Sequence, residues 1–200
     1  SIPETLRCRF HRTDAEVIDA SCELLNLLFD GVTDGPALLL ENLWEPGLTM
    51  TDPEMTARLL DGVRYANKGI MLDTGHLMHT QPALQNQRQA LSYIHTVLDR
   101  HGALCKAIRG VHLQQSITGR YMRRIAKNPP ELAADYPGRS YQLFEYVFRV
   151  DQHKPFTCAG VPELIARIAP EYLTFEFISN DLPQLRRMLH RQQNVFQKKT

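Results

Sequence analysis

Residues 69–76 read GIMLDTGH: a short apolar run stops at Asp73, and His76 follows three residues later. A continuous apolar run of this length is typical of a parallel strand that is covered on both faces. Similar runs occur at residues 37–41 (ALLLE), 107–113 (AIRGVHL) and 172–177 (YLTFEF). We therefore predict parallel strands that end at or near a polar side chain.

Helical patterns separate these strands. Thr13-Asp-Ala-Glu16 is a capping box, and Thr51-Asp-Pro-Glu54 is predicted to be a second one, opening a helix that ends near Tyr65. Apolar spacing predicts further helices at about residues 17–31, 82–101, 161–168 and 182–196. Residues 141–150 fit a helix or a strand, and residues 114–139 form a polar, basic excursion with room for one helix. Strands that alternate with helices define the α/β class.

Composition limits the class of protein further. The chain has 200 residues, 43% of them hydrophobic, and a formal net charge of +1. This size favours one domain over residues 1–200, and the low charge disfavours nucleic-acid binding by bulk electrostatics, although a local basic groove stays open. No stretch approaches the length of a membrane span. Cysteines 8, 22, 105 and 158 include no CxxC pair, so we predict reduced, mostly buried thiols and a cytoplasmic location.

Polar side chains stand at the ends of the predicted strands. Glu41, Asp73, His112 and Glu176 each occupy such a position. The carboxyl ends of parallel strands meet at one face, where active sites are built, so we expect these side chains to gather there. Clustered carboxylates need a counter-charge, and oxygen ligands with an imidazole suit Mn²⁺, Mg²⁺ or Zn²⁺. The sequence therefore predicts a divalent-metal site.

Three further residues are possible members of the metal site. His76 follows Asp73 by about one helical turn, as a second ligand or as a group that orients substrate, and Asp151-Gln-His153 brings two more donors. Simpler roles stay open for several of these residues. Asp73 could cap the following turn with His76 as its partner, His112 could be a satisfied core histidine, and Asp151 and His153 could form a polar turn before Pro155.

These motifs resemble the xylose isomerase-like TIM barrels, the superfamily of sugar and sugar-phosphate isomerases and epimerases that also contains endonuclease IV. In the epimerase branch a metal is held by Glu, Asp, His and Glu at successive strand ends. Those positions match Glu41 in LLLEN, Asp73 in MLDTGH, His112 in VHLQ and Glu176 in FEF. The resemblance implies that Glu41 and Glu176 also move protons on a small sugar substrate, with His76 as a hydrogen-bond donor to it.

Endonuclease IV extends the set. Its Asp-x-x-His and Asp-x-His motifs resemble Asp73-Thr-Gly-His76 and Asp151-Gln-His153, and it uses three zinc ions. The alternative function is therefore a zinc phosphodiesterase that acts on abasic DNA, with two or three zinc ions in place of one metal ion. The two further histidines of that enzyme come from earlier strands, for which this sequence offers no match. A third alternative is a non-catalytic barrel fragment.

The resemblance also implies an architecture. A full TIM-type (β/α) barrel needs about 250 residues. The chain is thus expected to be the C-terminal portion of such a barrel, with the first strands missing and residues 114–146 as a probable insertion. Completion by another chain, and hence a homo-oligomer, is possible.

Candidate substrate contacts complete the prediction. Trp44 could pack on a sugar ring, or serve as core packing. Gln114 follows the third strand and is a further candidate. Arg120, with Arg123, Arg124 and Lys127, could bind a phosphate or carboxylate of the substrate, or form a solvated helix face. No role is assigned to the remaining central and C-terminal histidines: His79, His95, His101 and His190.

Overall fold

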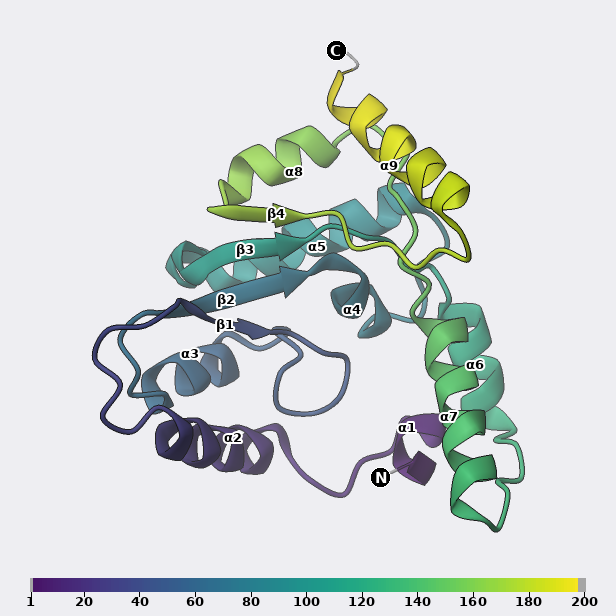
Figure 1. Ribbon diagram of the computed structural model, residues 1–200, viewed down its shortest axis with the longest axis horizontal. Coiled ribbons are helices and arrows are strands. Elements are labelled where there is room, and N and C mark those ends of the chain that lie inside the picture. The colour runs from purple at the N-terminus through teal and green to yellow at the C-terminus, as the bar shows by residue number, and fades with distance from the viewer. Residues whose placement is uncertain (1, 198–200) are drawn as a thin grey trace.

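The computed structural model describes residues 2–197, in which four parallel strands form one sheet (Figure 1). The order along the sheet follows the order along the chain: β1 (Leu38–Glu41), β2 (Lys68–Asp73), β3 (Ile108–His112) and β4 (Tyr172–Thr174). Each neighbouring pair is parallel, and helices connect successive strands. The predicted α/β class is confirmed. The sheet is open, with β1 and β4 at its edges, so the closed TIM-type barrel stays a prediction.

The helices agree in large part with the predicted ones. They are α1 (Ile2–Arg7), α2 (Asp14–Leu28), α3 (Pro53–Gly62), α4 (Thr74–His79), α5 (Gln87–His101), the 3₁₀ helix η1 (Gly102–Ala107), α6 (Gly119–Lys127), α7 (Tyr136–Val150), α8 (Val161–Ile168) and α9 (Leu182–Gln197). The excursion contains α6, and the ambiguous segment is the C-terminal part of α7. The segment 114–146, predicted to be an insertion, thus holds α6 and most of α7.

The capping predictions had mixed outcomes. The capping box between Thr13 and Glu16 is present at the start of α2. The second box was placed one residue too early, because Asp52 caps α3 through a hydrogen bond from the Glu54 amide. Pro53 then takes the first helical position, where its missing N–H costs nothing. Helix α5 was predicted to begin near 82, but it begins after Asn86, whose side chain accepts from the Gln89 amide.

The main core lies between one face of the sheet and the helices α5 and α8. Ile70, Leu72 and Val111 are at most 3% exposed and pack with Ile94 of α5 and Leu164 of α8. Burying such side chains is the main favourable term in folding. This covered face fixes the strands and so fixes the positions of their polar ends.

Strand β4 departs from the predicted pattern. It was expected to be a buried strand over residues 172–177, but it spans Tyr172–Thr174 and all three residues are exposed. The reason is its position at the edge of the sheet, where no further strand lies beyond it. The apolar residues of β4 therefore did not predict burial correctly, because an edge strand is not covered as the inner strands are.

A second layer stands beyond the carboxyl ends of the strands. Helices α6 and α7 lie side by side there, with α1 against them (Figure 1). Met122, Tyr146 and Val150 join these helices in a small core of their own, against which Trp44 packs. This layer forms a wall next to the strand ends.

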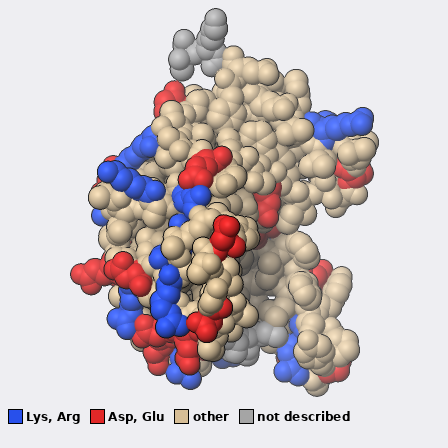
Figure 2. All heavy atoms as spheres, turned by 60° about the vertical axis from the view of Figure 1, so that its left-hand side comes forward, with Lys and Arg blue, Asp and Glu red and all other residues tan. Residues whose placement is uncertain are grey.

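Surface and thiol chemistry complete the description. Figure 2 shows basic and acidic side chains interspersed over one face, so no broad surface of a single charge covers that face. The four cysteines are free, but only Cys22 is buried, so the prediction of mostly buried thiols was wrong. No helix within residues 2–197 combines the length and the apolar character that a membrane crossing requires.

Candidate metal centre

The sheet register brings the predicted ligands together. Asp73 pairs with His112 across β2 and β3, and Glu41 ends the neighbouring strand β1. Glu176 follows β4 by two residues, beyond the pairing of His112 with Thr174. Ligand atoms of these four residues all lie within 4.8 Å of one another. We call Glu41, Asp73, His112 and Glu176 the carboxylate cluster.

One imidazole nitrogen faces the three carboxylates of this cluster. His112 Nδ1 lies 3.3 Å from Glu41 Oε1, 3.0 Å from Glu176 Oε2 and 4.0 Å from Asp73 Oδ2. The hydrogen bond between His112 and Glu41 lowers the pKa of Glu41 and raises the pKa of His112. Burial raises the pKa of Asp73 to about 6, against the opposing charge of His76. His112 thus faces the three carboxylates and is not a core histidine.

Two buried oxygens of the cluster lack hydrogen bonds. Asp73 Oδ2 and Glu176 Oε2 are shielded from solvent, and neither makes a hydrogen bond within the described residues, although His112 Nδ1 lies 4.0 and 3.0 Å from them. A buried carboxylate oxygen without a partner is costly, and a divalent cation is a partner that satisfies several such oxygens at once. Oxygen donors with one imidazole fit Mn²⁺, Mg²⁺ or Zn²⁺. The residues present therefore fit a metal ion.

Asp73 is positioned by its place at a strand–helix junction. Its side chain caps α4, with Oδ1 accepting from the His76 amide at 2.7 Å and from Gln114 Nε2 at 3.0 Å. Asn42 exchanges two backbone-directed hydrogen bonds with Asp73, at 2.7 and 3.0 Å, which ties β1 to β2. One carboxylate oxygen is thus used by the fold, and Oδ2 is left for a ligand.

A second group of ligand atoms lies next to the first. His76, Asp151 and His153 offer atoms within 4.8 Å of one another, and His79 also contacts Asp151. Asp151 Oδ2 lies 2.6 Å from His153 Nε2 and 3.1 Å from His76 Nε2, and Asp151 Oδ1 lies 3.3 Å from His79 Nε2. We call these four residues the Asp151 cluster. All four are buried.

The backbone around Asp151 is built to hold it. His153 has a φ of 46°, in the left-handed region that a non-glycine residue seldom adopts and that often marks functional sites. Ser116 Oγ accepts from the amides of Gln152 and His153 at 2.8 and 3.1 Å and donates to Asp151 Oδ1 at 3.3 Å. The turn after α7 is therefore fixed from the neighbouring loop.

Charge is balanced within the Asp151 cluster. Burial would raise the pKa of Asp151, but hydrogen bonds from His153, His76 and His79 outweigh it and lower that pKa strongly. Burial would lower the pKa of His76, but Asp151 and Asp73 outweigh it and raise that pKa to about 9. Burial dominates at His79 and lowers its pKa. The cluster is thus satisfied by protons, which a metal ion would have to displace.

The two clusters adjoin. His76 Nδ1 lies 3.3 Å from Glu41 Oε1, and His153 Nδ1 lies 3.9 Å from Glu176 Oε2. The two clusters therefore form one continuous group of candidate ligand atoms. The predicted metal residues, including the three possible ones, therefore all meet at one locus.

His76 and Gln114 are hydrogen-bonded to other protein groups. His76 lies 2.9 Å from the Asn42 carbonyl through Nδ1 and 3.1 Å from Asp151 through Nε2, so neither nitrogen is free to bind substrate. Gln114 is fully buried and donates to both Asp73 and Asp151, at 3.0 and 3.2 Å. Both residues therefore position carboxylates.

Trp44 and Arg120 lie outside the two clusters. The Trp44 ring packs on His76 and His79, with centroids 5.0 and 4.9 Å apart, and its Nε1 makes no hydrogen bond within the part of the chain that the structure describes. Arg120 is exposed on α6, in a hollow next to Gln152. Neither residue contacts the ligand atoms of the carboxylate cluster in the described contacts.

Sequence reasoning missed His79, Ser116 and Asn42. His79 had a visible signal, because it follows His76 by three residues and so shares its face of a helix. Ser116 and Asn42 had none, because hydrogen bonds from loops to distant carboxylates leave no local pattern.

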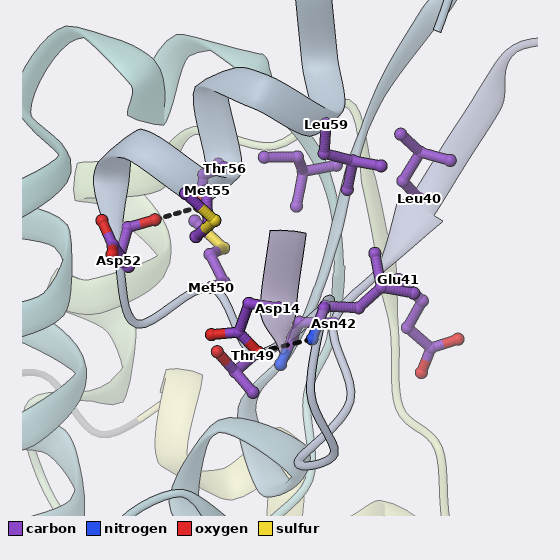
Figure 3. Close-up of a pocket in the computed structure, with 13 residues that line it drawn as sticks. Asp14, Leu40, Glu41, Asn42, Thr49, Met50, Asp52, Met55, Thr56 and Leu59 are labelled. Atoms are coloured by element: carbon purple, nitrogen blue, oxygen red, sulfur yellow. Dashed lines mark hydrogen bonds between the residues drawn. The ribbon is translucent and has the colours of Figure 1, made fainter. Parts of the chain in front are cut away.

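A cavity under β1 shares Glu41 with the metal centre. It lies between β1, α3 and the loop of residues 42–52, and Asp14 borders it through a hydrogen bond to the Gly47 amide. Figure 3 shows that the Glu41 carboxylate points away from this cavity. The chemistry of Glu41 thus belongs to the carboxylate cluster.

No family model, curated protein or solved structure matches the chain.

Proposed function

We propose that this protein is a divalent-metal-dependent sugar or sugar-phosphate isomerase or epimerase, built on the C-terminal part of a TIM-type barrel. One observation carries the proposal. Glu41 and Glu176 are the most accessible ligands of the carboxylate cluster, with side chains 34% and 40% exposed, and they flank His112, whereas Asp73 is fully buried. Two accessible carboxylates beside a metal position suit proton removal and return on a bound substrate.

Each residue of the carboxylate cluster has a distinct role in the proposed reaction. A bound metal would polarise the substrate carbonyl and stabilise the negative charge that develops on its oxygen. Glu41 or Glu176 removes a proton from the neighbouring carbon, and the other glutamate returns one. Asp73 and His112 hold the metal, and His76 supports Glu41 from the Asp151 side. The low pKa of Glu41 keeps that carboxylate ionised at neutral pH.

The first test replaces one proton carrier. We expect Glu176→Gln to abolish isomerisation of sugars by the Mn²⁺-loaded protein while the circular dichroism spectrum stays unchanged. Glu171→Gln is the matched control, because Glu171 is exposed and bonded to Arg109, away from the cluster. Unchanged turnover in Glu176→Gln would refute the proposed role of that residue.

The Asp151 cluster supports a second function. A second group of ligands next to the first is the arrangement needed to generate hydroxide and clamp a phosphodiester, as in an endonuclease IV-like zinc phosphodiesterase that acts on abasic DNA. Under that alternative, Asp151 and His153 are ligands of a second or third zinc ion. Endonuclease IV uses two further histidines from earlier strands, and these have no counterpart in this sequence.

Elemental analysis separates the alternatives. One Mn²⁺ or similar ion per chain, unchanged in His153→Asn, would support the isomerase. Two or three zinc ions per chain, reduced in His153→Asn, would support the phosphodiesterase. A folded chain that binds no metal would favour a non-catalytic barrel fragment. A cytoplasmic location, a small sugar substrate and completion of the barrel by a second copy belong to the same proposal.

A further inference from the structure

A hollow lined by arginines opens beside the Asp151 cluster. It lies between the start of α6, the end of α7 and the turn that follows α7. Its lining residues are Ile117, Thr118, Arg120, Tyr121, Arg124, Arg149 and Gln152. No aspartate or glutamate is among them, so its electrostatic potential is positive.

The guanidinium groups in the hollow are available for a ligand. Neither Arg120 nor Arg124 forms an ion pair with an acidic side chain within residues 2–197. Arg149 contacts Glu145 one helical turn away, at 3.4 Å and with both side chains exposed, an interaction that contributes little. Guanidinium groups that share a hollow repel one another, so binding of an anion between them is favoured.

The hollow is also held in shape. Thr118 Oγ1 donates to the Val150 carbonyl at 2.6 Å, which ties the start of α6 to the end of α7. The Arg124 guanidinium lies over the Tyr121 ring, 5.3 Å from its centroid, which holds this cation in the hollow. Helix α6 begins here, so the positive end of its dipole adds to the field of the arginines.

The neighbouring basic residues of α6 are excluded. Arg123 donates to the Pro82 carbonyl, and neither Arg123 nor Lys127 lines the hollow. A second basic hollow, next to Pro155 and α9, is lined by Lys154, Arg187 and Arg191. It has a single ammonium and two guanidinium groups, and Gln87 at the start of α5 also lines it, so the start of a helix does not distinguish the two hollows. Three planar guanidinium forks match the oxygens of a phosphate better.

The hollow borders the candidate metal centre through one residue. Gln152 lines the hollow, stands between Asp151 and His153 in the chain, and is fixed by the hydrogen bond from its amide to Ser116. We propose that this hollow binds the phosphate group of a phosphorylated sugar substrate, through Arg120, Arg124 and Arg149. This inference rests on the proposed function, because it assigns the phosphate to the substrate of the neighbouring centre.

Calorimetric titration of the Mn²⁺-loaded protein tests the proposal. The probes are inorganic phosphate, ribose 5-phosphate and ribose. We expect the first two to bind, and ribose to bind at least tenfold more weakly than ribose 5-phosphate. Arg120→Ala, Arg124→Ala and Arg149→Ala should each weaken phosphate binding about tenfold, the usual worth of one charge-assisted hydrogen bond. Arg124→Lys should recover only part of the loss, since it keeps the charge and loses the fork.

Matched controls define the outcomes that would overturn the proposal. Lys127→Ala removes the same charge from the same helix outside the hollow, and Arg187→Ala removes one from the second basic hollow, so both should stay within twofold of the original affinity. An equal loss in either control, or no loss in the three hollow variants, would overturn it. Binding of an abasic DNA duplex that depends on these arginines, without binding of ribose 5-phosphate, would overturn it as well.

The test is independent of the proposed function. Metal content and the effect of Glu176→Gln on sugar turnover are measured separately, so a failed isomerase assay leaves the phosphate affinities readable. Conversely, loss of the anion site leaves the metal stoichiometry unchanged.

Discussion

The Asp151 cluster and the carboxylate cluster adjoin, yet their hydrogen bonding differs. The Asp151 carboxylate accepts from three histidines, Gln114 and Ser116. The carboxylate cluster contains two buried oxygens, Asp73 Oδ2 and Glu176 Oε2, that make no hydrogen bond within the described residues and share one imidazole nitrogen, His112 Nδ1, at 4.0 and 3.0 Å. One cluster has a hydrogen bond for each oxygen of its carboxylate, and the other has a single imidazole for three carboxylates.

This difference indicates which of the two clusters a metal ion should bind first. In the Asp151 cluster a metal ion has to displace protons from imidazoles that Asp151 already stabilises. In the carboxylate cluster it displaces the proton of His112 but supplies a larger counter-charge to three carboxylates that repel one another. We therefore expect the first ion to bind the carboxylate cluster, with the Asp151 cluster as its rigid support or as a weaker second site.

The largest expected effect comes from removing the acceptor at the centre of the Asp151 cluster. Asp151→Ala leaves buried imidazoles and an amide without their partner, a loss of about 3–5 kcal/mol in the free energy of unfolding. Urea denaturation of the metal-free protein measures it. Asp99→Ala is the control, because Asp99 forms an exposed ion pair with Arg167 and should change stability by about 1 kcal/mol or less. A similar small change for Asp151→Ala would contradict the support role.

The next effect is stabilisation by metal. At a free Mn²⁺ concentration of about 100 times the dissociation constant, the native protein should gain about 2.7 kcal/mol. The double variant Glu41→Gln/Glu176→Gln should lose this gain while keeping its metal-free stability, since both side chains are partly exposed. Thermal unfolding with and without Mn²⁺ measures both quantities. Full protection of the double variant would place the ion elsewhere.

The same measurement repeated across pH sharpens the comparison. The pKa of Asp73 is raised by burial to about 6 in the native protein, above its ordinary value of 3.8. The native state therefore holds this proton more tightly than the unfolded state, so the Asp73 contribution makes metal-free stability fall as pH rises from about 4 to 6. Metal protection needs ionised Asp73 and should rise over the same interval. Protection that is independent of pH between 4 and 7 would exclude Asp73 as a ligand.

A smaller effect tests the residue that joins the two clusters. A Cβ added at Gly75 would lie 2.0 Å from Gln114 Nε2, so Gly75→Ala should push this amide away from Asp73 and Asp151. Overpacking of this kind costs about 1–3 kcal/mol, and it should also lower the affinity for Mn²⁺. Gly62→Ala is the matched control: its Cβ would lie 2.6 Å from Cys22 Sγ, which costs stability far from the centre and should leave Mn²⁺ affinity unchanged.

The sequence predicted those ligands of the centre that occupy equivalent positions at the ends of successive strands. Glu41, Asp73 and His112 each end an apolar run, and parallel pairing alone brings such ends together. It did not predict α4, because a helix of six residues offers no periodicity to detect. Without α4, His79 had no assigned position. The role of Gln114 was also hidden, since a buried amide that bridges two carboxylates depends on packing between distant segments.

His79 gives the smallest of these effects and the most specific one. Its Nε2 is the third imidazole nitrogen on Asp151, at 3.3 Å, and its Nδ1 has no partner within the described residues. His79→Asn keeps a polar group near Asp151, so the loss in stability should be about 1 kcal/mol, the worth of one hydrogen bond. If His79 positions Asp151, the variant should also weaken binding of a second metal ion while leaving the first unchanged, because Asp151 makes no hydrogen bond or ion pair with the carboxylate cluster within the described residues. Stepwise Mn²⁺ or Zn²⁺ titration measures this difference, and equal weakening of both steps would show that His79 acts on the fold as a whole and not on one of the two clusters.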